Sequence, residues 1–180
     1  MPFDWAEKPL SDVVEFLDHK RVPLKSADRV KRQGSYPYYG ASGIIDHIDD
    51  YLFDEELVLL SEDGANLVDR NYPVAFIVSG KYWVNNHAHV LRVNSSHSIH
   101  YLQEYLEAIT YLPYITGTAQ PKLNQKVCHD IPVPIPPKHE EDEITLILTT
   151  LNKRLENIAE RKEQALNIKK KLLNTHLNNG

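Results

Sequence analysis

A proline-rich segment divides this chain at residues 131–137. It reads Ile131-Pro132-Val133-Pro134-Ile135-Pro136-Pro137, and each proline lacks the backbone N–H that helices and sheets use. We therefore expect no regular structure there. A helix-compatible stretch of roughly forty residues follows. The sequence thus predicts two parts, a globular domain over residues 1–137 and a spacer helix over residues 138–180.

The spacer segment has the charge order and the apolar spacing of one long helix. Carboxylates at Glu140–Glu143 suit an electropositive helix N-terminus, and Lys169–Lys171 suit the opposite end. Apolar residues follow the alternating four-and-three spacing of a coiled coil. We expect antiparallel pairing with a second copy, while a helix folded back on its own domain is the alternative. The candidate dimerisation residues are Leu148, Leu151, Leu155, Ile158, Ala165 and Leu172.

The globular part mixes helix and strand patterns. Residues 10–17 have the apolar spacing of one helical face, as does a segment that begins at Ser98 and ends by Pro113. Four short apolar runs, most of them flanked by turn residues, predict strands. These runs are residues 43–45, 57–60, 74–78 and 88–93. The pattern indicates an α+β fold.

Composition limits the size and the compartment of the protein. A chain of 180 residues with 42% apolar content can bury one sizeable core plus an appendage. Its one cysteine, Cys128, cannot form an internal disulfide, and the Met1-Pro2-Phe3-Asp4 start lacks the features of a secretory leader. No apolar run approaches the roughly twenty residues of a membrane span. We expect a cytoplasmic protein that does not cross a membrane.

Charge is unevenly distributed along the chain. The net charge of −5 argues against a simple nucleic-acid binder, because phosphate neutralisation needs cations. Between residues 20 and 32, however, six cationic side chains face a single carboxylate, that of Asp28. A solvated loop and a phosphate-facing patch are equally good interpretations. The six residues are Lys20, Arg21, Lys25, Arg29, Lys31 and Arg32.

Two glycine-containing polar segments, residues 36–43 and 116–125, have the composition of ligand-contacting loops. Glycines let a backbone approach a ligand closely, and the neighbouring aromatic, hydroxyl and amide groups can stack or hydrogen-bond. A third segment, at residues 85–87, adds two more amides. Asn and Gln can pair bidentately with adenine, which suits readout of base edges. The candidate contact residues are Tyr38, Tyr39, Asn85, Asn86, His87, Gln120, Lys122 and Asn124.

No catalytic centre is evident. Glycine motifs for dinucleotides or triphosphates are missing, and so is a nucleophile elbow. His87 with His89, or Cys128 with His129, could bind a metal, but the spacing favours hydrogen-bonding histidines. Glu62-Asp63 could hold magnesium in a nuclease. A turn stabilised by Asp63 is the simpler interpretation.

Together these segments resemble the specificity subunit of type I restriction-modification systems. The resemblance rests on the order of five segments that span almost the whole chain. They are Tyr36-Pro37-Tyr38-Tyr39-Gly40-Ala41-Ser42-Gly43-Ile44, Leu60-Ser61-Glu62-Asp63-Gly64-Ala65, Asn86-His87-Ala88-His89-Val90-Leu91, Thr116-Gly117-Thr118-Ala119-Gln120-Pro121-Lys122-Leu123-Asn124, and the proline-rich segment leading into a helix. Members of this family typically carry two recognition domains and two spacer helices, so this chain resembles a half-subunit.

The resemblance implies a mixed α/β target recognition domain followed by a long coiled-coil helix. It implies a non-catalytic reader of one half of a bipartite DNA site, without cofactor or metal. The expected partners are double-stranded DNA, methyltransferase (modification) subunits, a restriction subunit and a second copy of the chain. Two other functions stay open: a metal-dependent nuclease using Glu62 and Asp63, and a helical scaffold whose globular domain binds protein.

Overall fold

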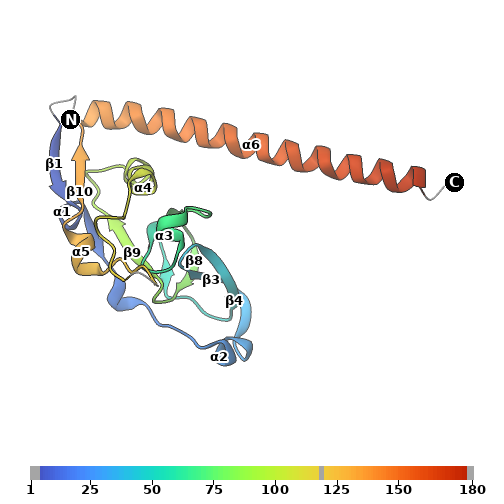
Figure 1. The fold of residues 1–180 in the computed structure, drawn as a ribbon, viewed down its shortest axis with the longest axis horizontal. Helices are drawn as coiled ribbons and strands as arrows, with labels where there is room; N and C mark the ends of the chain where they lie inside the picture. Colours follow the sequence, from blue (N-terminus) through green and yellow to red (C-terminus); the bar gives the residue numbers. More distant parts are fainter. Residues whose placement is uncertain (1–4, 118–119, 178–180) are drawn as a thin grey trace.

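The computed structural model describes residues 5–117 and 120–177, with side chains described as far as Asn174. It consists of a mixed α/β domain and one long helix that extends beyond the edge of the domain (Figure 1). The expected fold class is therefore confirmed. The Met1–Asp4 start, and Thr118 and Ala119 of the second glycine-containing segment, lie outside the described residues.

A four-stranded antiparallel sheet, in the order β2-β9-β6-β7, carries most of the core. All five residues of β6 are buried, which explains why its sequence is an unbroken apolar run ending in Ser61. The strands are β2 (Val14–Phe16), β6 (Leu57–Ser61), β7 (Ala75–Val78) and β9 (Ala88–Val93). The last three confirm strands that the sequence predicts.

A second four-stranded sheet, in the order β4-β3-β8-β5, lies beside the first. Strands β3 and β4 form a hairpin, and β3 pairs in parallel with β8. The sequence predicts only the start of β4 in this sheet. Glycines and a proline interrupt β3, and β5 and β8 are only two and four residues long. The strands are β3 (Gln33–Gly40), β4 (Gly43–Ile48), β5 (Phe53–Asp54) and β8 (Lys81–Val84).

The prediction of one helix over residues 10–17 is wrong. Helix α1 (Leu10–Val13) makes a single turn, and the chain then extends as β2, which pairs with β9. The four apolar residues that suggested a helical face, Leu10, Val13, Val14 and Leu17, are nevertheless all buried. A turn followed by a strand satisfies the same apolar pattern, and pairing with β9 decides between the two structures.

The proline-rich segment is also more regular than expected. Strand β10 (Pro132–Ile135) pairs antiparallel with β1 (Ala6–Pro9) in a two-stranded ribbon. In an antiparallel pair only alternate residues exchange hydrogen bonds with their partner. The prolines occupy the other alternate positions, so Val133 and Ile135 can still donate, and Val133 is buried in the core.

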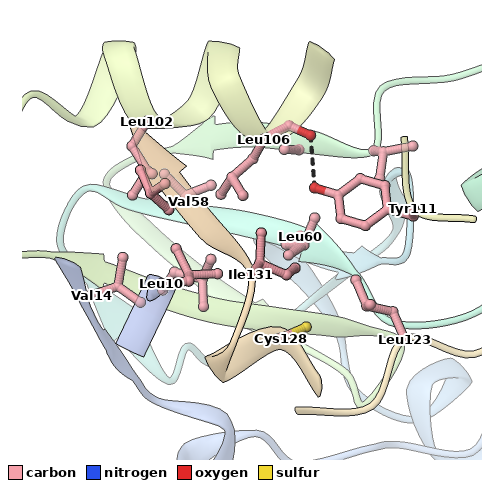
Figure 2. Close-up of a cluster of buried hydrophobic side chains, with 14 of the residues drawn as sticks. Leu10, Val14, Val58, Leu60, Leu102, Leu106, Tyr111, Leu123, Cys128 and Ile131 are labelled. Carbon is pink, nitrogen blue, oxygen red and sulfur yellow. Dashed lines mark hydrogen bonds between the residues drawn. The ribbon is translucent and has the colours of Figure 1, made fainter. Parts of the chain in front are cut away.

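Helix α4 (Ile99–Ala108) covers the β6–β7 side of the first sheet. It starts after Ser98, where the sequence predicts a helix to begin, and the Ser98 hydroxyl accepts a hydrogen bond from the amide of Tyr101. The helix ends at Ala108, five residues before Pro113. Near this end, the Tyr111 hydroxyl donates to the Leu106 carbonyl at 2.7 Å (Figure 2). Figure 2 shows α4 on one side of the buried cluster and Leu10, Cys128 and Ile131 on the other.

Helix α6 (Lys138–Leu177) is continuous over 40 residues, about 60 Å at roughly 1.5 Å per residue. Its first turns pack on α4, where Glu141 accepts from the Ser98 amide and Asn152 donates to Glu104 at 2.6 Å. Beyond Asn152 the described side chains of α6 are exposed. The domain therefore covers only the first part of the helix. Among the described helices, none is long and apolar enough to cross a membrane.

Short helices complete the domain. They lie in the connections between the strands. The short helices are η1 (Asp18–Lys20), α2 (Ser26–Val30), α3 (Asn66–Asp69) and α5 (Gln125–His129).

Candidate nucleic-acid interface

Three segments that are distant in the sequence meet at one polar pocket of about 440 Å³. They are the turn after β6, the turn before β9, and the loop that precedes α5. All three segments contain residues that the sequence marks as candidates for ligand binding or turns, but their separation along the chain gives no sign that they meet. The lining residues are Asp63, Gly64, Ala65, His87, Gln120 and Lys122.

Main-chain hydrogen bonds join these segments. The amide of Glu62 donates to the His87 carbonyl at 2.9 Å, and the amide of Leu123 donates to the Glu62 carbonyl at 2.7 Å. The amide of Gly64 donates to the Pro121 carbonyl at 3.1 Å. The pocket wall is therefore a fixed backbone surface and does not depend on side-chain packing alone.

The first glycine-containing segment supports the rim of the pocket. Its hairpin turns at Gly43, whose φ of +135° is a conformation that L side chains rarely adopt. Beside the turn, the Ala41 carbonyl accepts from the Ser61 hydroxyl, and Ser42 accepts from the Asn66 amide at 3.2 Å. This hairpin holds the loop that carries Asp63.

The exposed chemistry of the pocket is an imidazole, an amide and an ammonium group. The side chain of His87 is 50% exposed, and its Nδ1 lies 2.9 Å from the Asp63 carboxylate. Lys122 is 45% exposed, and its Nζ lies 3.0 Å from Glu62. Gln120 is exposed. These groups can donate and accept hydrogen bonds to a polar ligand.

A network of buried charges connects to the pocket through Glu62. Arg21 donates to Glu62 at 2.6 Å and to the Ala88 carbonyl at 2.7 Å, and it lies 3.3 Å from Asp18. The Asp18 carboxylate accepts from His89 at 2.6 Å and from the Val90 amide at 2.9 Å. The side chains of Asp18 and His89 are 5% and 1% exposed. Every charge of this cluster has an oppositely charged neighbour, which buried charges require.

The pKa values of the network favour its charged state. Burial lowers the pKa of His89, but the hydrogen bond and charge of Asp18, together with the neighbouring Cys128 sulfur, outweigh burial and raise it to about 10. Burial raises the pKa of Asp18, yet the hydrogen bond and charge of His89 lower it overall. The pKa of Glu62 is also lowered, because hydrogen bonds from Arg21 and Lys122 outweigh the effect of its burial.

These contacts argue against the nuclease alternative. Glu62 is neutralised by Arg21 and Lys122, and Asp63 is paired with His87 instead of stabilising its own turn. In the described part of the chain, one group has metal-ligand atoms near each other, namely Asp18, Glu62 and His89. Its carboxylates already bind side-chain cations, and a protonated imidazole cannot ligate a metal. These residues do not fit a metal ion.

The basic segment divides into two classes. The three arginines form ion pairs within the domain: Arg21 as described, Arg29 with Asp46 at 2.8 Å, and Arg32 with Asp49 at 2.9 Å. Arg29 and Arg32 also lie over the rings of Tyr38 and Trp83. The three lysines are exposed, and no ion pair of the described residues includes them. These lysines are Lys20, Lys25 and Lys31.

Two of the predicted contact residues are buried, and a third, Tyr39, is half-buried. Tyr38 is 1% exposed, and its hydroxyl accepts from the Leu24 amide at 2.9 Å. Asn85 is 4% exposed and accepts from the His87 amide at 2.8 Å. Tyr39 packs against Phe76 and Tyr82. Tyr38 and Asn85 are therefore not available to a ligand, and the expectation that they contact one is corrected.

Asn86 and Asn124 remain accessible. Asn86 is exposed in the turn before β9, and Asn124 is half-buried and donates to Thr116 at 3.2 Å. Sequence reasoning missed the roles of Asp18 and His89. Their pairing depends on η1 lying against β9, and nothing in their local sequence signals that contact.

The candidate dimerisation residues lie along α6. Leu148 is half-buried where the helix meets α4, and the others have exposed side chains. Exposed large apolar side chains include Leu151, Leu155 and Ile158, at 49%, 64% and 61%. A row of this kind is unusual on a solvated helix and is typical of a protein-binding surface.

Known proteins resemble this chain in sequence or in fold. A relative from Haemophilus influenzae, described as a type I restriction enzyme specificity subunit, is 38% identical over 144 residues, or 80% of this chain. The chain spans 36% of that relative's length. The S subunit of a type I restriction-modification system from M. genitalium covers 87% of this chain with a TM-score of 0.68 and 13% identity, and the chain spans 41% of it.

The HsdS subunit from Thermoanaerobacter tengcongensis covers 87% of this chain with a TM-score of 0.57 and 16% identity, and the chain spans 39% of it. At these identities the two solved structures establish the shared fold. The family model described as the type I restriction modification DNA specificity domain matches residues 2–167. The chain therefore belongs to the family of type I restriction-modification DNA specificity domains.

Proposed function

We propose that this chain reads DNA sequence as a specificity subunit of a type I restriction-modification complex. One observation carries the proposal: in a chain of this family, three segments converge on a single pocket that presents an imidazole, an amide and an ammonium group. Such groups hydrogen-bond to base edges and phosphates. The pocket lies on loops held by two sheets, a common arrangement for binding sites.

The proposed contact surface has two parts. Base edges meet the pocket and its rim, and phosphates meet the exposed lysines of the basic segment. Arg21, Arg29 and Arg32 stabilise these surfaces and do not contact DNA in this proposal, because their guanidinium groups already form ion pairs within the domain. The proposed contacts are Asn86, His87, Gln120, Lys122 and Asn124 for bases, and Lys20, Lys25 and Lys31 for phosphates.

In this proposal the chain is a non-catalytic reader. Methyl transfer belongs to separate methyltransferase subunits, and cleavage belongs to a restriction subunit. The net charge of −5 implies weak binding to DNA by the chain alone and firm binding with its partners. The half-subunit acts as a dimer through α6, with one recognition domain at each end, and each copy reads one half of a bipartite site.

Mapping methylated bases in the genome of the source cell tests the proposal. Deleting the gene for this chain should abolish methylation at one defined motif, and returning the gene should restore it. The purified chain, assayed with a labelled methyl donor and DNA but no partner, should transfer nothing. Methylation that survives the deletion unchanged would reject the role, and transfer by the lone chain would reject a non-catalytic reader.

A further inference from the structure

His89 connects the buried charge network to the proposed reading loop. Its Nδ1 lies 2.6 Å from the Asp18 carboxylate, and its Nε2 lies 2.7 Å from the Leu123 carbonyl oxygen. A carboxylate and a carbonyl oxygen both accept hydrogen bonds, so both ring nitrogens donate. His89 is thus an imidazolium that donates on one side to the Asp18 carboxylate and on the other side to the loop at Leu123.

The loop is held at the residue that lies between two proposed contacts. Leu123 follows Lys122 and precedes Asn124, and its own side chain is buried. Its amide donates to the Glu62 carbonyl at 2.7 Å, while its carbonyl accepts from His89. Both of its main-chain groups are therefore engaged, one by the Glu62 turn and one by a buried side chain.

We propose that His89 is a positioning residue for DNA recognition: by donating from Nε2 to the Leu123 carbonyl, it holds Gln120, Lys122 and Asn124 where they meet base edges. This inference rests on the proposed function. Recognition groups must be held within about half an ångström of their working geometry, and supporting residues provide that precision. His89 is too buried to touch DNA itself, so it acts only through the loop.

Two substitutions of His89 distinguish the roles of its two ring nitrogens. In His89→Gln the side-chain amide reaches roughly as far as Nε2 and can still donate to Leu123. In His89→Asn it reaches only as far as Nδ1, so it can contact Asp18 but not the loop. Both variants lose the charge and the ring of His89, so we expect similar losses of folding stability in the two. Only His89→Asn should lose sequence selectivity.

The measurement uses the chain purified with its methyltransferase subunits. A duplex carrying the mapped methylation motif and a duplex with the same bases scrambled are titrated at one salt concentration, and the two affinities are compared. We expect the affinity ratio to fall about tenfold or more in His89→Asn, since one lost base contact accounts for about that much. In His89→Gln the ratio should stay within about threefold of wild type.

Leu57→Ala is the stability control. Leu57 is buried in a different core cluster, at the end of β6 away from the pocket, so its truncation destabilises the domain without touching the loop. Thermal unfolding of all variants ranks their stability. If selectivity follows stability in the three variants, or if His89→Gln and His89→Asn lose it equally, the positioning role is overturned. A wild-type complex without selectivity would instead reject the proposed function.

A spectroscopic test needs no variant to fold. In the wild-type chain, NMR of the histidine side chains should show a proton on Nε2 of His89 and a coupling across its hydrogen bond to the Leu123 carbonyl. An Nε2 without a proton at neutral pH would overturn the inference.

Discussion

At the scale of single residues, the main distinction is between charges that hold the fold and charges left for a ligand. Arg21 is almost fully enclosed by Asp18, Glu62 and the Ala88 carbonyl, whereas Lys31, in the same basic segment, is exposed. The planar guanidinium group suits several fixed acceptors at once, and the flexible ammonium group suits a mobile polyanion. The two kinds of residue should respond differently to mutation.

Replacing Lys25 and Lys31 by alanine should weaken DNA binding and flatten its salt dependence. Each phosphate contact contributes a slope of about −0.9 in a plot of log affinity against log salt, so the double variant should lose up to about 1.8. Arg21→Ala is the comparison: it should lower the unfolding temperature and leave the slope of the remaining folded protein unchanged. An unchanged slope in the lysine variant would remove those residues from the interface.

Alkaline pH should destabilise the domain through His89. Its pKa is raised to about 10 in the folded protein, above about 6.5 for an unfolded histidine. Its stabilisation is therefore fully present below pH 6.5 and is lost as pH rises towards 10. Urea unfolding at several pH values across that window should show the loss. His89→Gln removes the titrating group, and a pH dependence equal to wild type in that variant would contradict the assignment.

At the scale of secondary-structure elements, tertiary pairing overrides local preference at both ends of the domain. The β1–β10 ribbon closes the domain, although one of its strands contains prolines and the other ends in one. Its geometry is possible because the prolines alternate with residues that can donate. The alternation, and not the number of prolines, decides whether this segment can pair.

Val133→Pro and Pro134→Ala should therefore have unequal effects. The first removes a main-chain donor and a buried side chain, and should destabilise the domain by roughly 2–4 kcal/mol. The second changes a half-buried position that makes no donor contact, and should cost less than about 1 kcal/mol. Chemical denaturation of both variants measures the difference. Equal losses would mean that the register of the ribbon is wrong.

At the scale of the whole molecule, α6 would set how the two recognition domains of the proposed dimer are arranged. Only its first turns contact the domain, and the rest of the helix extends beyond it (Figure 1). The described apolar side chains of α6 beyond Asn152 are exposed. A two-fold axis would let one sequence supply both surfaces of an antiparallel pair. Two identical readers then require inverted, identical half-sites, and the length of the helix helps to set the gap between them.

Replacing Leu151, Leu155 and Ile158 by glutamine should convert dimers to monomers in light scattering. The control is Leu146→Gln. Leu146 is 68% exposed but lies on another side of the helix, so this variant should remain a dimer. A wild-type chain that is monomeric at micromolar concentration would count against the arrangement. So would a methylated motif whose two halves are unrelated.

Much of this architecture could be predicted from the sequence, because some signals are local. The periodicity and charge order of α6, the apolar runs of β6 and β9, and the start of α4 near Ser98 each depend on neighbouring residues. Tertiary structure decided what depends on contacts between distant segments. It turned residues 14–16 into a strand, paired the prolines, buried Tyr38 and Asn85, and brought Asp18 to His89. Side-chain type shows what a residue can bind. Only the folded chain determines which partner it does bind, because burial removes the water that would otherwise compete for its hydrogen bonds.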